Sequence, residues 1–504
     1  NCTIQNNTIT LNRTYQNTFG IYANSTHTAT AATTSASATG AGGGASGLKI
    51  YSNTISNVNN GIVVVGPTAA ADANTGIDIG GTSLATGNTL TNYGTTGTFS
   101  GYTNVSGSVN GILVRNSIGF NISFNSITSS NGGATLGTLN GIQIPAASIA
   151  PTSTFTNNIL GNIISLQSGL ITGAINGIEY PSGSASTTSV LNVNGNSFTR
   201  LNYSATASGA IVAINVASTN LTTSISSNTF NNLSVNSSGS FTFINHAFTI
   251  PGAGSMNLDN NSIVTAFNKT VANGNITIFS SASGSSLNGT SFTYSGNNFS
   301  NINSSGTSSI TGITNTNGSN SGPNKVITGN NFSNWTTASG SITGISITRG
   351  GTVTCTISDN IINNLNNTSS ITAISLGSTN AGLCPIFISN NTISGLTSSG
   401  TGGTVVGISS TNGAAEININ GNTVSSLSST AASVSGISAT GSATLHKIFS
   451  NKVHSLTSSS TNASVTGFVS AGGTTSNVYN NLVGLLTSPN ANAANAVIGI
   501  NVSG

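Results

Sequence analysis

The stretch Ile388-Ser-Asn-Asn391-Thr-Ile393-Ser-Gly-Leu396 contains the repeat on which this chain is built. An Asn stands at its centre, with one apolar residue three positions before it and another two positions after it. The same arrangement recurs as Ile419-Asn-Gly-Asn422-Thr-Val424-Ser-Ser-Leu427 and as Ile448-Phe-Ser-Asn451-Lys-Val453-His-Ser-Leu456. We call the central Asn of each copy the anchor, because an internal period of this kind decides the fold.

Fifteen anchors run from one end of the sequence to the other, separated by 29 to 46 residues. The residue three before the anchor is non-polar in every copy, with Ala85 as its weakest representative, and the residue two after it is always Ile, Leu, Val or Phe. Such regularity indicates a repeat protein. The anchors are Asn7, Asn53, Asn88, Asn125, Asn162, Asn196, Asn228, Asn261, Asn297, Asn330, Asn360, Asn391, Asn422, Asn451 and Asn481.

Each repeat offers about three short segments of alternating polarity, separated by turns rich in Gly, Asn and Ser, which is typical of strands. A second landmark, a small residue followed by an apolar one as in Gly344-Ile345, marks the third segment. No segment has a sustained helical period. The apolar positions around the anchor break strict alternation, which predicts a sharp turn there, and Asn tolerates left-handed backbone geometry.

A repeat of three short strands cannot bury an apolar face alone, so successive repeats must stack as coils. Each strand would then pair in parallel with its copy one coil on, about 4.8 Å away. Apolar residues would form interior columns, and the anchors a ladder of hydrogen-bonded amides. We therefore predict an all-β fold, a parallel β-helix of about 15 coils with three strands per coil and an Asn-rich corner.

These columns with an Asn corner resemble the right-handed parallel β-helix of pectin-lyase-like proteins. The wording of the repeat, Gly421-Asn-Thr-Val-Ser-Ser-Leu427, also resembles repeat regions of large secreted bacterial surface proteins, particularly those exported by type IX secretion. The resemblance implies right-handed coils and an extracellular, secreted or surface-attached location. The leucine-rich repeat is the competing solenoid, but its period is about 20–29 residues and Leu dominates it, whereas Ile and Phe dominate here.

We expect residues 1–504 to form one continuous β-helix. Its early coils (1–160) carry longer insertions, at Ala23–Gly47, Gly66–Gly87 and Tyr93–Ser108, and its later coils (297–504) are tighter. The first coil begins within a strand and the last stops after the strand that holds Ile500. The sequence therefore reads as a segment of a longer chain, with flanking coils, other domains or further copies end to end as partners.

The composition excludes several classes of protein. Only 15 of 504 residues are charged, which is 3% against roughly 25% in an ordinary soluble domain, and the net charge is +3. Nine cations cannot neutralise a nucleic-acid backbone. No apolar run approaches the about 20 residues of a membrane span, and three cysteines do not make a disulfide scaffold. A charge repeated in every coil would also repel its own copy.

Little in the sequence points to catalysis. Glycoside hydrolysis needs two carboxyl groups within about 5–10 Å of each other. The acids are Asp72, Asp78, Glu179, Asp259, Asp359 and Glu416. In the repeat register Asp259 and Asp359 lie three coils apart, about 14 Å, whereas Asp72 and Asp78 share one coil and flank a predicted turn. We therefore predict a protein that is not an enzyme and needs no cofactor or metal, with a polysaccharide lyase or hydrolase on the early loops as the runner-up.

A few side chains remain as candidates for binding or cross-linking. Lys447, Lys452 and His454 form the densest group of basic residues and are predicted to face outward, where they could meet an anionic glycan. Cys355 is predicted inside and Cys384 diagonally from it on the next coil, about 8 Å away, so that a disulfide between them requires a shifted strand. The remaining histidines and Cys2 show no metal-ligand spacing, and His446 and Cys2 fall at an inward position.

The favoured function is a structural or adhesive segment of a secreted surface protein, a rigid stalk or fibre. Binding or degradation of cell-surface polysaccharide is the first alternative. Ice binding through outward Ser and Thr at one and three positions after the anchor is weaker, because that array is interrupted at Ile163, Val264 and Lys452.

Overall fold

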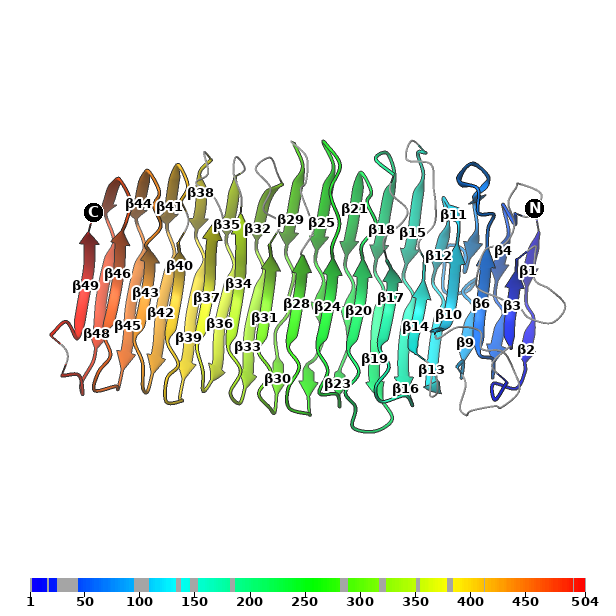
Figure 1. Cartoon of the computed structure of the whole chain (residues 1–504), viewed down its shortest axis with the longest axis horizontal. Helices are drawn as coiled ribbons and strands as arrows, with labels where there is room; N and C mark the ends of the chain where they lie inside the picture. The colour runs from blue at the N-terminus through cyan, green and yellow to red at the C-terminus, as the bar shows by residue number, and fades with distance from the viewer. Residues whose placement is uncertain are drawn as a thin grey trace. The chain divides into compact units, whose positions relative to one another are not determined.

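The computed structural model of the protein describes residues 2–15, 18–24, 44–94, 108–132, 137–145, 153–181, 186–281, 289–316, 323–349, 354–378, 384–411, 413–492 and 494–503. The chain divides into two compact units, Asn1–Pro251 and Gly252–Gly504, which we call unit 1 and unit 2. Each unit is a parallel β-solenoid with three sheets, named A, B and C in the order in which the chain visits them. Within a unit, strands of successive coils lie side by side (Figure 1). Continuity across residues 1–504 stays a prediction.

Unit 1 contributes seven strands each to sheets A and C among its described residues. Sheet A consists of β1 (Thr3–Gln5), β4 (Lys49–Tyr51), β8 (Asp78–Ile79), β12 (Asn121–Ser123), β15 (Thr156–Leu160), β18 (Val190–Asn194) and β21 (Thr222–Ser226). Sheet B consists of β2 (Thr8–Thr10), β5 (Thr54–Ser56), β9 (Thr89–Thr91), β13 (Ser126–Gly132), β16 (Ile163–Ser168), β19 (Ser197–Tyr203) and β22 (Thr229–Phe230), with β23 (Leu233–Val235) after it in the chain. Sheet C consists of β3 (Phe19–Ala23), β6 (Asn60–Val65), β10 (Ser108–Arg115), β14 (Thr138–Gln143), β17 (Ile175–Tyr180), β20 (Ile211–Val216) and β24 (Phe241–His246). The segment between β6 and β8 adds the 3-10 helix η2 (Ala70–Asp72) and β7 (Asn74–Thr75), which pairs with β11 (Ser117–Ile118) between β10 and β12 of the next coil.

Unit 2 repeats the plan with eight described strands in each of sheets A and C. Sheet A consists of β25 (Ser255–Asp259), β29 (Ser291–Ser295), β32 (Asn324–Thr328), β35 (Cys355–Ser358), β38 (Ile386–Ser389), β41 (Glu416–Asn420), β44 (Leu445–Phe449) and β47 (Thr475–Tyr479). Sheet B holds β27 (Phe267–Lys269), β30 (Ile302–Ser304), β33 (Asn331–Thr337), β36 (Ile361–Asn367), β39 (Thr392–Ser398), β42 (Thr423–Ser429), β45 (Lys452–Ser458) and β48 (Leu482–Thr487), with β26 (Ser262–Ile263) before them in the chain. Sheet C consists of β28 (Ile276–Ser281), β31 (Ile310–Asn315), β34 (Ile342–Arg349), β37 (Ile371–Ser378), β40 (Val405–Ser410), β43 (Val434–Ala439), β46 (Val465–Ala471) and β49 (Val497–Ser503).

Strand pairing follows the sequence repeat residue by residue. Ile388 pairs with the residue at the same position in the coils before and after it, Ile357 and Ile419. Ile393, two residues after its anchor, pairs in the same way within sheet B. The residues named here and their pairing partners are fully buried, and burial of such apolar surface is the main force that holds the coils together. The predicted all-β parallel solenoid with three strands per coil is confirmed.

The anchors form the predicted ladder, one in each unit. In unit 2 the backbone N–H and the Nδ2 amide of Asn360 both donate to Oδ1 of Asn391, at 3.1 and 2.9 Å. The second Nδ2 hydrogen of Asn360 bonds Ile327 O, one coil back, at 2.9 Å. Similar bonds run from Asn7 to Asn228 in unit 1 and from Asn261 to Asn481 in unit 2. Because the anchors from Asn53 to Asn451 are buried, these bonds avoid the cost of an unpaired interior amide.

The left-handed residue at the corner is not the anchor, which corrects the sequence-based expectation. Positive φ angles belong to the residue before it, as at Asn390 (55°), Ser450 (55°) and Gly421 (66°). This residue bends the chain between sheets A and B, so that the anchor can point its amide into the interior although the residue three before it also points inward. The short polar or Gly residue tolerates the left-handed region, and the anchor supplies the hydrogen bonds.

The register prediction fails at Ala85. In the structure Ile79, not Ala85, pairs with Ile50 and Ile122 in the interior column of sheet A. The segment from Gly80 to Gly87 is an insertion between that strand and the anchor Asn88, and its turn begins with the left-handed Gly80 and Gly81. The interior column is filled by Ile79 although its distance in sequence from the anchor is not the usual three residues, because the buried column must continue from coil to coil. The segments 23–47 and 93–108 lie largely outside the described residues.

Candidate functional site

Asp78, one member of the predicted acid pair, binds its neighbours through both carboxylate oxygens. Oδ1 accepts hydrogen bonds from Asn121 Nδ2 at 2.8 Å and from the Gly81 N–H at 3.2 Å. Oδ2 accepts the hydroxyl of Tyr51. Burial, together with Asp78, raises the pKa of Tyr51 to about 12, so this phenol stays protonated and keeps donating. The carboxylate of Asp78 therefore links the insertion of residues 80–87 to sheet A through hydrogen bonds. Asp72, the other member of the pair, is the last residue of the 3-10 helix η2.

Glu179 is the most buried acid of the described residues, 9% exposed on β17. Its two carboxylate oxygens accept Asn215 Nδ2 at 3.0 Å each, and Asn245 Nδ2 continues the chain to Asn215 Oδ1 at 2.7 Å. Burial raises the pKa of Glu179, although the bond from Asn215 lowers it. Its pairing partner on the other side is Gln143. Glu179 is thus one carboxylate in a column of amides.

The other acids also have structural neighbours. Asp259 accepts a 2.5 Å hydrogen bond from Ser295. Asp359 is the left-handed residue before its anchor, with φ of 57°. Glu416 forms an ion pair with Lys447 at 2.9 Å. No group of three His, Cys, Asp or Glu that could hold a metal ion occurs within the described ranges.

The predicted basic group is divided between two sheets. Lys447 lies on β44 of sheet A and bonds Glu416. Lys452 and His454 lie on β45 of sheet B, where Lys452 is exposed and His454 Nδ1 contacts Ser455 Oγ at 3.0 Å. Thus Lys447 is neutralised by its partner, and Lys452 is the exposed cation that an anionic glycan would meet.

The interior candidates are placed as follows. His446 is fully buried, as predicted, with Nδ1 3.1 Å from Ser470 Oγ, and burial lowers its pKa. Cys355 is buried on β35 and pairs with Ile386. Cys384, two residues before Ile386, is half-buried, and the structure holds both cysteines as thiols. Cys2, expected inside, is exposed. His27 lies outside the described residues.

Two buried lysines escaped the sequence interpretation. Lys325 occupies the inward position five before its anchor, between Phe292 and Cys355, and donates to Thr348 O at 2.8 Å. Lys269 donates to Val271 O at 2.9 Å and to Asn273 O, and burial lowers its pKa to about 8. The repeat register contained the signal, because both lysines fall at positions that are inward in other coils.

Lys269 stands where other coils of sheet B place a small polar residue. Thr337 donates to Ser308 O at 2.7 Å, and Ser429 to Gly403 O at 2.8 Å. These side chains point inward at the end of the strand and satisfy carbonyl groups in the turn of the preceding coil, whereas Lys269 satisfies carbonyl groups of the turn that follows it. The ammonium group of Lys269 therefore serves as a substitute for a hydroxyl at a corner of the coil.

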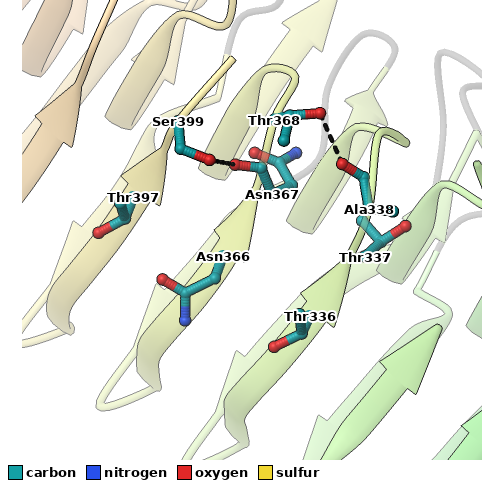
Figure 2. Close-up of a pocket in the computed structure, with 8 residues that line it drawn as sticks. All are labelled: Thr336, Thr337, Ala338, Asn366, Asn367, Thr368, Thr397 and Ser399. Carbon is teal, nitrogen blue, oxygen red and sulfur yellow. Dashed lines mark hydrogen bonds between the residues drawn. The ribbon is translucent and has the colours of Figure 1, made fainter. Parts of the chain in front are cut away.

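A shallow hollow lies on the outside of sheet B in unit 2, with a volume of about 210 Å³. Figure 2 shows Thr336, Asn366 and Thr397 on the three neighbouring strands β33, β36 and β39. Beyond them, Thr368 Oγ1 donates to Ala338 O at 2.5 Å and Ser399 Oγ to Asn367 O at 3.3 Å. The hollow is lined by hydroxyl, amide and methyl groups and by no charge, so it suits a neutral ligand that forms hydrogen bonds. The lining residues are Thr336, Thr337, Ala338, Asn366, Asn367, Thr368, Thr397 and Ser399.

Comparison of the chain with protein-family models, with curated proteins and with solved structures finds no match. A search of the described residues for a helix long and apolar enough to cross a membrane finds none. The arrangement of the side chains themselves must therefore support any functional conclusion.

Proposed function

We propose that this chain is a non-catalytic structural or adhesive segment of a secreted cell-surface protein, and that it forms a rigid stalk or fibre. The resemblance of its repeat to pectin-lyase-like β-helices and to bacterial surface proteins exported by type IX secretion supports this location. Its neighbours would be flanking coils or domains of the same longer chain, or further copies stacked end to end.

The anchor ladder is the observation that carries this proposal. Within each unit, every anchor before the last joins the next coil through its Nδ2 amide and also through its backbone N–H, as Asn391 does to Asn422 at 3.0 and 2.9 Å. A slip by one residue would break these bonds and turn the apolar column outward. Because each coil is held to its neighbours in the same way, cohesion is distributed along the solenoid, which suits a part that transmits force.

Extension of single molecules held at both ends would test the stalk. We expect resistance to stretching and then unfolding in repeated steps of about one coil, roughly 100 Å for 30 residues. Asn391→Ala should lower the unfolding force, and Asn364→Gly, at an exposed position of sheet B, should leave it unchanged. Stretching of the chain at forces too low to unfold ordinary domains would contradict the stalk. Release of products from pectin, alginate or chitin would contradict a non-catalytic role.

The hollow on sheet B favours a second candidate function, binding of a neutral cell-surface glycan. Its volume accommodates roughly one sugar ring, and its row of Thr336, Asn366 and Thr397 offers both donors and acceptors. On an array of neutral glycans, Asn366→Tyr should abolish any signal by filling the hollow. Thr457→Tyr, in the same outward column but outside the hollow, serves as its control. Equal binding by both variants would show that the hollow is not the glycan-binding site.

A further inference from the structure

Sheet C of unit 2 presents two adjacent columns of hydroxyl groups over six successive coils. The first column is interrupted only by Val406, and the second is unbroken. We call these eleven residues the hydroxyl face. They are Thr277, Thr311, Thr343, Thr372 and Ser435 in the first column and Ser280, Thr314, Ser346, Ser375, Ser409 and Ser438 in the second.

The local structure of each strand sets the spacing of the two columns. In β31 the two residues between Thr311 and Thr314, Gly312 and Ile313, both point inward, so the two threonines both face outward. A Cβ on Gly312 would lie 2.2 Å from the carbonyl oxygen of Gly344, which shows how closely the coils approach there. The strands β31, β34, β37 and β40 lie side by side in Figure 1. Successive hydroxyls are therefore about 4.8 Å apart, and the face extends for about 24 Å along the coils.

The hydroxyls of this face form no hydrogen bond with other side chains or with the backbone among the described residues. The outward column of sheet B differs, because Ser428 donates to Thr397 at 3.2 Å and Thr457 lies 2.9 Å from Thr487. Each hydroxyl can donate one hydrogen bond and accept two. Except at Ser435, whose Oγ is buried without a partner, the hydroxyl face thus carries a regular set of donors and acceptors that only an external partner or water can satisfy.

The chemistry of the face limits what that partner is. None of its positions carries a charge, which argues against an anionic polymer, and none carries an aromatic ring on which a sugar could stack. The partner must both donate and accept hydrogen bonds at a short, regular spacing over several coils. An ice surface has these properties, because every water molecule in its lattice donates and accepts at fixed positions.

We propose that the hydroxyl face of unit 2 binds ice. The anchor ladder keeps the coils in register, and a stacked side-chain ladder of this kind can hold a sheet flat enough to meet a crystal plane. The β-branched threonines restrict χ1 and hold their hydroxyl and methyl groups in place before contact. The outward positions at one and three after the anchor cannot do this, because Ile361, Lys452 and Leu482 interrupt the column nearest the anchor in unit 2.

The gap between the melting and freezing temperatures of an ice crystal held in a solution of the protein tests this proposal. The unmodified protein should open a gap that grows with concentration and should keep small ice crystals from coarsening. Thr343→Tyr combined with Thr372→Tyr should abolish both effects by lifting the face from the crystal plane. Thr457→Tyr, a matched outward substitution on sheet B, should retain them.

A second variant is expected to strengthen ice binding, so that the test does not depend only on a loss of activity. Ser346→Thr combined with Ser375→Thr should widen the gap several-fold at equal concentration, because threonine is more restricted than serine. The far-ultraviolet circular dichroism of each variant must match that of the unmodified protein. The proposal would be overturned if the unmodified protein showed no gap between melting and freezing temperatures. It would also be overturned if Thr457→Tyr abolished the gap as completely as the Thr343→Tyr, Thr372→Tyr variant does. Binding to crystalline chitin or cellulose that the Thr343→Tyr, Thr372→Tyr variant loses, without any effect on ice, would overturn it in favour of a polysaccharide.

Discussion

Asn391 donates both its backbone N–H and its side-chain amide to one oxygen, Oδ1 of Asn422, at 3.0 and 2.9 Å. Asn391 Oδ1 in turn accepts both donors of Asn360. The remaining amide hydrogen of Asn391 bonds Ile357 O, so every polar atom of this buried side chain has a hydrogen-bond partner. The two coils that flank Asn391 are thus joined through it.

Replacement of Asn391 by Ala should lower the free energy of unfolding by about 3 kcal/mol, because it leaves several buried partners unpaired at about 1–3 kcal/mol each. Asn364 is exposed and left-handed, and it donates to Asn334 at 3.0 Å. Asn364→Gly should therefore change stability by less than about 0.5 kcal/mol. Midpoints of urea unfolding measure both, and equal shifts would show that the ladder is not important for stability.

Gly329→Ala should lower the free energy of unfolding by about 1–2 kcal/mol, the cost of a left-handed backbone for an L-residue. Gly329 has φ of 64°, and the nearest atom to an added Cβ would be Gly296 N at 3.8 Å, so the effect is conformational and not steric. Gly377→Ala is the control, because that glycine has an ordinary φ and open space around it. The outcome that contradicts this account is an equal midpoint for the two variants.

Stability should fall as the solution is acidified below pH 6.5 because of His246. Burial lowers the pKa of His246 to about 3, below its ordinary value of 6.5. Between these two pKa values, His246 is therefore protonated in the unfolded chain and neutral in the folded chain. Its contribution to stability is complete above pH 6.5 and is lost toward pH 3, at about 1.4 kcal/mol per pH unit.

The pH dependence can be assigned with two variants. His246→Leu should reduce the slope of stability against pH between about 3 and 6.5, and His454→Asn, on the outward face of β45, should not. Urea midpoints at several pH values provide the measurement. An unchanged slope in His246→Leu would show that this histidine is protonated in the folded chain.

Glu179→Gln should stabilise the protein at pH 7, on the order of 1 kcal/mol, the scale of one hydrogen bond. The raised pKa of Glu179 means that the folded chain holds its proton more tightly than the unfolded chain, so stability falls as pH rises above the ordinary value of 4.5. Glutamine removes the charge and keeps an oxygen for Asn215. Asp78→Asn should instead destabilise, because its carboxylate accepts bonds from Tyr51, Asn121 and Gly81. Thermal melts that move both variants in one direction would contradict this contrast.

The sequence repeat predicted the columns accurately wherever the spacing was constant. Ile388, Ile393 and their equivalents lie where the anchor register puts them, and His446 lies inside. The register failed at Ala85 because an insertion changed the spacing, and a column cannot be followed through an insertion by counting. The hydroxyl face was missed because the third strand was recognised only by its inward Gly-Ile pair, and the outward residues beside that pair were not aligned between coils.

The amino-acid sequence by itself determined the stacking of coils. An apolar residue on either side of a recurring Asn can be buried in every repeat only if the repeats pair in parallel, and neutral side chains permit identical positions to stack. The tertiary structure decided which atoms satisfy each other. It placed the left-handed turn before the anchor, paired Lys447 with Glu416, buried Lys269 and Lys325, and left the hydroxyls of Thr343 and Ser346 unpaired. These outcomes depend on distances between residues about 30 positions apart in the chain, which only the folded coil brings together.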